Sequence, residues 1–83
     1  MSKLSPVSYK KLVAVFEAEG FVCVRTEGDH MIFTKPGIVR PVVIPKYASL
    51  PVFIIKNNLK TGGISETVIL NSWVNSAPQF LSL

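Results

Sequence analysis

The sequence has very few of the residues that build covalent or metal-based sites. Its 83 residues include one cysteine, Cys23, and one histidine, His30. A single thiol cannot form an internal disulfide, and a reducing compartment suits it. One histidine, one cysteine and scattered acids offer no ligand cluster with the spacing of a metal site, and no serine or cysteine has a second histidine to activate it. We therefore expect no metal and no cofactor.

Long apolar runs are also missing, although 48% of the residues are hydrophobic and 17% are charged. No run approaches the roughly 18 residues of a membrane-spanning helix, and the first residues do not resemble a signal peptide. This composition is typical of a folded domain in the cytoplasm, without membrane contact. The length allows a single domain over residues 1–83, with a core over about 8–70 and a tail over 71–83 that has no periodicity.

Acidic side chains are absent from the middle of the chain, and the net charge is +4. Cations and acids balance over residues 1–30, whereas residues 35–60 carry only cations: Lys35, Arg40, Lys46, Lys56 and Lys60. A field of one sign attracts polyanions, and nucleic acid is the common cytoplasmic one. The alternative is an ordinary solubilising surface.

The hydrophobic pattern predicts a helix, three strands and a second helix. The first helix covers about 8–19, with Ser8 or Ser5-Pro6 as its cap and Gly20 as its end. Strands are expected over 21–25, 30–35 and 39–44, the first two joined by a Glu27-Gly28-Asp29 turn. The second helix runs from about 51 to 60, is stopped by Gly62-Gly63, and is followed by a short helical turn after Ser65.

This order predicts an α+β fold in which one three-stranded antiparallel sheet carries its helices on one face. The α-β-β-β-α order is that of double-stranded-RNA-binding domains, which read the shape and 2′-hydroxyls of RNA. Pro41 and Pro45 lack ladder donors, so the third strand is at an edge or short. On the second strand His30, Ile32 and Thr34 share one side, while Met31, Phe33 and Lys35 share the other. Which side faces the core stays open.

His30 is the candidate for proton transfer, because histidine both accepts and donates a proton near neutral pH. It follows a Gly-Asp turn and opens an alternating strand. A lone histidine in a small domain is more often a structural residue than a catalyst, so the residue type alone does not assign the role.

The order of several short motifs resembles the HicA (YcfA-like) toxin family over residues 8–70. They are Phe16-Glu17-Ala18-Glu19-Gly20-Phe21, Arg25, Gly28-Asp29-His30, Val43-Ile44-Pro45, the segment Leu50-Pro51 to Leu59, and Gly63-Ile64-Ser65. The resemblance implies a type II toxin–antitoxin toxin that acts as an mRNA interferase, with His30 at the position of the catalytic histidine. It also implies a cognate HicB-like antitoxin that covers the active face. Asp29 stands where many members have serine, and Tyr47 where many have a second histidine, which puts any use of that histidine in doubt.

Cleavage of RNA without a metal requires activation of a ribose 2′-hydroxyl and protonation of the leaving 5′-oxygen, and one imidazole can serve either step. Cations offset the charge that builds on the phosphorane oxygens. Arg25, Lys35 and Lys46 are the candidates for this role, with Lys56 as an outlying phosphate contact. The alternative is a non-catalytic RNA-binding or protein-adaptor domain in which His30 only stacks or hydrogen-bonds.

Overall fold

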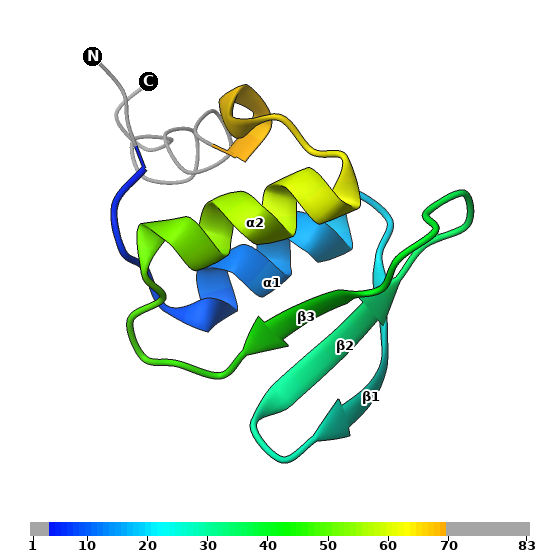
Figure 1. Ribbon diagram of the computed structural model, residues 1–83, viewed down its shortest axis with the longest axis horizontal. Helices are drawn as coiled ribbons and strands as arrows, with labels where there is room; N and C mark the ends of the chain where they lie inside the picture. The colour runs from blue at the N-terminus through cyan, green and yellow to red at the C-terminus, as the bar shows by residue number, and fades with distance from the viewer. Residues whose placement is uncertain (1–3, 70–83) are drawn as a thin grey trace, which may run out of the picture.

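The computed structural model describes residues 4–69 and has the predicted α-β-β-β-α order. Helix α1 spans Tyr9–Ala18 and helix α2 spans Val52–Gly62, while the strands are β1 (Val22–Glu27), β2 (His30–Thr34) and β3 (Val42–Pro45). The strands form one antiparallel sheet in the order β1-β2-β3. Figure 1 shows both helices on the same side of this sheet, which leaves its other face open. The fold is the α+β arrangement of double-stranded-RNA-binding domains.

Both helices begin and end where the sequence indicates. The Ser8 hydroxyl accepts a hydrogen bond from the backbone N–H of Lys10 at 3.2 Å, which caps the first turn of α1. Gly20 follows this helix with a φ of 95°, a conformation that residues with a Cβ rarely adopt. Gly63 closes α2 in the left-handed conformation.

The third strand begins later than expected. Residues 39–41 are not part of the sheet, and β3 starts at Val42, after Pro41. Proline has no N–H for the ladder, so pairing starts only beyond it. The expectation of a short edge strand is confirmed, since β3 has four residues and pairs only with β2.

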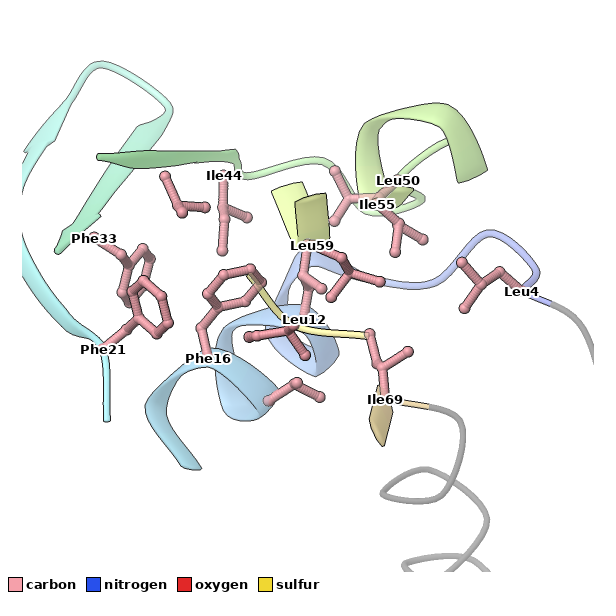
Figure 2. Close-up of a cluster of buried hydrophobic side chains, with 13 residues drawn as sticks. Leu4, Leu12, Phe16, Phe21, Phe33, Ile44, Leu50, Ile55, Leu59 and Ile69 are labelled. Atoms are coloured by element: carbon pink, nitrogen blue, oxygen red, sulfur yellow. The ribbon is translucent and has the colours of Figure 1, made fainter. Parts of the chain in front are cut away.

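The core lies between the helices and the sheet, as Figure 2 shows. Phe33 of β2 is fully buried there and Met31 packs against the cluster, so this side of the strand faces the helices. His30 therefore lies on the open side. Ile32 shares that side and is still only 6% exposed, since its cross-strand neighbours Arg25 and Val43 flank it.

The end of α2 approaches α1 closely at Gly62. A Cβ at this position would lie 2.8 Å from Cε2 of Phe16 and 3.2 Å from Cζ of Phe21. The two rings pack edge to face, with centroids 5.0 Å apart. Only glycine fits without moving them, which explains why this position of α2 is a glycine.

A helical turn over residues 66–69 follows Ser65, whose carbonyl and hydroxyl both accept from the N–H of Val68. The expected continuation to Leu70 and the tail over 71–83 lie outside the described residues. Over residues 4–69, no helix has the length and apolar character that crossing a membrane requires.

Candidate active site

His30 is the first residue of β2, directly after the β1–β2 turn, and Figure 1 shows this turn at the lower end of the sheet. The two strands are joined by Gly28-Asp29, and Gly28 has a φ of 60°. Glycine is favoured at the first position of a two-residue hairpin turn because that position needs a positive φ. The side chain of His30 is 48% exposed, so a ligand in solution can reach the imidazole.

The carboxylate of Asp29 lies beside the imidazole. Its Oδ1 is 3.0 Å from Nδ1 of His30, and the side chain of Asp29 is 65% exposed. A negative charge at this distance favours a proton on Nδ1 over one on Nε2. In a neutral ring that carries its proton on Nδ1, Nε2 on the other side of the ring is the acceptor.

Lys46 is brought to the same end of the sheet by the pairing of β2 with β3. His30 is paired with Pro45, and the next residue donates its backbone N–H to the carbonyl of Asp29 at 2.7 Å. Tyr47 follows with 41% exposure, and its carbonyl accepts from the N–H of Tyr9 at 3.1 Å. The turn, the start of α1 and this loop are therefore tied together through the backbone.

A β-bulge in β1 places Arg25 on the open face of the sheet. Cys23 pairs with Phe33, and the next pair is Arg25 with Ile32, so Val24 between them has no cross-strand partner. Without this extra residue Arg25 would point to the core side, because a slip of one position reverses every side chain. The bulge thus sets Arg25 on the same face as His30.

Arg25 is paired with an acid that sequence reasoning missed. Its Nε contacts Oε2 of Glu27, and both side chains are more than 60% exposed. Glu27 is in turn the cross-strand partner of His30. The signal was present in the Arg-Thr-Glu spacing, because residues two apart on a strand share a face.

The other two predicted cations lie away from the imidazole. Lys35 follows the opposite end of β2, where its Nζ lies 5.3 Å from the centroid of the Phe21 ring. Lys56 is exposed on α2. The structure brings Arg25 and Lys46 toward His30 and does not bring Lys35 there. Within residues 4–69, no three side chains of histidine, cysteine, aspartate or glutamate gather as metal ligands would.

Comparison with known proteins adds one finding. The family model described as the HicA toxin of bacterial toxin-antitoxin systems matches residues 9–64, which include both helices and the whole sheet. A search of curated proteins finds no match.

Proposed function

Because the chain belongs to the HicA toxin family and is thus the toxin of a toxin–antitoxin system, we propose that it acts as an mRNA endonuclease. In this proposal it cuts messenger RNA in the cytoplasm and so blocks translation, with His30 as general acid and base. The observation that carries the proposal is the contact between Asp29 and His30 on an exposed turn. It presents one imidazole nitrogen to a substrate and keeps the other beside a carboxylate.

The reaction needs only groups that the chain and RNA supply. Nε2 of His30 takes the proton of a ribose 2′-hydroxyl as its oxygen attacks the adjacent phosphorus. The bond from phosphorus to the 5′-oxygen breaks, and that oxygen takes a proton from the imidazolium of His30, which returns the ring to its neutral form. The products are a 2′,3′-cyclic phosphate and a free 5′-hydroxyl. A positioned acid or base is worth about 10²–10⁴-fold in rate.

Charge near the turn supports the phosphate side of this reaction. Lys46 directly follows the cross-strand partner of His30, so its ammonium serves as a contact for the phosphate. Arg25 lies on the same face and contacts Glu27, so the substrate phosphate competes with the Glu27 carboxylate for the guanidinium of Arg25. Lys56 contributes a more distant contact to the RNA backbone.

The partner of the family is a cognate antitoxin, which we propose is a HicB-like protein that covers the hairpin tip. The region from Lys35 to Lys60 carries no acid. An acidic antitoxin surface is complementary to this region, and complementary charge speeds association and selects partners.

The test is cleavage of single-stranded RNA by the purified chain with a metal chelator present. We expect cleavage to continue in chelator and to stop in the His30→Ala variant, which should keep its circular dichroism spectrum. An RNA with a single 2′-deoxyribose at the cleaved position should resist, since the internal nucleophile is missing. Cleavage at the normal rate by His30→Ala would overturn the assignment of His30. If the native chain binds RNA without cutting it, the domain is a non-catalytic RNA-binding module.

A further inference from the structure

A second feature lies at the opposite end of the molecule from His30. The loop between β2 and β3 and the last turn of α2 border an open hollow of about 480 Å³. Its lining residues are Gly37, Ile38, Val39, Arg40, Lys60 and Thr61. In Figure 1 this loop and the end of α2 lie on one side of the molecule, and the β1–β2 turn lies at the other end of the sheet. The volume falls within the range of small-ligand sites.

The hollow combines two cations that come from distant parts of the chain. Arg40 is supplied by the loop and Lys60 by α2, and no acidic residue lines the hollow. Within residues 4–69, neither Arg40 nor Lys60 takes part in an ion pair, so no carboxylate of this part of the chain neutralises either cation. Two like charges that face one space repel each other, and an anion between them removes that cost. Thr61 lines the same hollow, and threonine carries a hydroxyl that can donate a hydrogen bond.

The loop that forms one wall is fixed to the fold and carries an exposed apolar side chain. Ile38 donates its N–H to the carbonyl of Lys35 at 3.1 Å and packs partly against the core. The next residue, Val39, is 96% exposed, although valine gains by burial. The hollow therefore offers an apolar surface beside two cations. This pair of features is complementary to a nucleotide, in which a base or ribose lies next to a phosphate.

We propose that this hollow is a subsite for one nucleotide of an RNA strand whose cleaved bond lies at His30. The phosphate lies between Arg40 and Lys60, and the sugar or base lies on Val39. The proposal rests on the proposed function, because it names how the same substrate is held.

The distance between the two sites gives the subsite a role. The four steps of β2 from His30 to Thr34 alone span about 13 Å at the usual rise of a strand. A dinucleotide at His30 does not reach the hollow, whereas a longer strand reaches both sites. The hollow therefore contributes to the binding of long RNA and has no effect on a dinucleotide.

Binding is tested without cleavage by ¹H–¹⁵N spectra of the full-length His30→Ala chain during titration. The probes are inorganic phosphate, adenosine 5′-monophosphate and a single-stranded RNA several times longer than a dinucleotide. We expect the amide signals of Gly37, Val39, Arg40 and Thr61 to shift with the monophosphate and the RNA. The shifts should disappear in an added Arg40→Ala/Lys60→Ala pair of substitutions and persist with Lys10→Ala, a control that removes an exposed lysine on α1. Shifts with inorganic phosphate but with neither the monophosphate nor the RNA would mean a simple anion site and overturn the nucleotide assignment.

The kinetic test uses the native His30 with two substrates. We expect the Arg40→Ala/Lys60→Ala variant to raise KM for long RNA by about tenfold or more, since one contact of charges across water is worth roughly fivefold. Its kcat on long RNA and both constants for a dinucleotide should stay unchanged. Equal effects on both substrates, or none on long RNA, would overturn the subsite.

The two proposals fail in different ways. If no RNA is cleaved but the signals of the hollow shift with nucleotide, the catalytic proposal fails and the hollow is a nucleotide-binding site without a cleavage role. If RNA is cleaved and the variant behaves as native, the subsite fails alone. A variant that binds RNA normally but loses the antitoxin would assign the hollow to the antitoxin and overturn the proposal.

Discussion

Oδ1 of Asp29 lies 3.0 Å from Nδ1 of His30, the next residue in the chain. The contact therefore depends only on the local geometry of one hairpin turn, and no distant element has to bring the two groups together. Its consequence is electrostatic, because the carboxylate makes the two ring nitrogens unequal.

The first prediction follows from this contact. Asp29→Asn keeps the size of the side chain and removes its charge, so we expect a roughly fivefold lower kcat, the value of one charge contact screened by water. Nitrogen chemical shifts of the imidazole should show the proton on Nδ1 in the native chain and a more even distribution in the variant. An unchanged proton distribution would contradict this role even if the rate fell.

Asp29→Ser is the matched companion, because serine is polar and suits a turn but carries no charge. It should behave as Asp29→Asn in the nitrogen spectrum, since it also lacks the charge. If Asp29→Ser keeps both the native rate and the native proton distribution, the turn conformation and not the carboxylate determines which ring nitrogen of His30 carries the proton.

The second prediction separates the cations by position. Lys46→Ala should weaken RNA binding and reduce the slope of log K against log salt by about 0.7, the value of one phosphate contact on a single strand. Lys35→Ala should leave the slope unchanged, because its ammonium lies over the ring of Phe21 at the other end of β2. It should instead lower the free energy of unfolding by about 0.5–1 kcal/mol, as expected for a lost cation–π contact. Binding curves at several salt concentrations and urea unfolding measure the two effects; an equal slope change in both variants would refute the distinction.

The third prediction concerns the close approach of the helices. Gly62→Ala adds a Cβ that would meet Phe16 at 2.8 Å. Overpacking in a core costs about 1–3 kcal/mol, which outweighs the gain of up to about 1 kcal/mol from the better helix propensity of alanine. We expect a net loss of stability in urea unfolding.

The control for this substitution is Asn57→Ala, at an exposed position of the same helix. It brings the propensity gain without the contact and should stabilise the chain by a few tenths of a kcal/mol. If Gly62→Ala stabilised the chain as much as the control does, the packing argument would be refuted.

The fourth prediction is made in living bacteria. Expression of the native chain alone should arrest growth, and co-expression of its cognate antitoxin should restore it. His30→Ala should not arrest growth, because the proposed proton-transfer group is missing. The fold should stay intact, since the exposed imidazole lies outside the core. Equal amounts of native and variant protein on a blot are the necessary control. Arrest by His30→Ala at native levels would assign toxicity to something other than its chemistry.

The element order and the ends of both helices could be predicted from the sequence, because those signals are local. Ser8 caps α1 and Gly63 ends α2 through contacts with their own chain neighbours. The sequence pattern predicts too early a start for β3, because Val39 has strong β propensity. Its actual environment, a loop that carries it 96% exposed, depends on Pro41 and on the packing of Ile38.

The candidate site was predictable only in part for the same reason. His30 and Asp29 are chain neighbours, so the turn pattern placed them together. The position of Lys46 near His30 depends on the register of β3. The orientation of Arg25 depends on a bulge that no alternation pattern reveals. Lys35 had the right charge, but the neighbouring Phe21 ring that holds it comes from a different part of the chain.

The exposed hairpin tip has a consequence for inheritance. His30 makes no part of the buried cluster that holds the helices to the sheet. A gene copy that has lost this histidine would still produce a chain of the same shape, which occupies the antitoxin as long as the other residues of the covered surface suffice for binding. In a cell with both copies, such a chain would draw the antitoxin away from the active toxin. A loss-of-function allele would then act as a sensitiser, and its harm would be dominant.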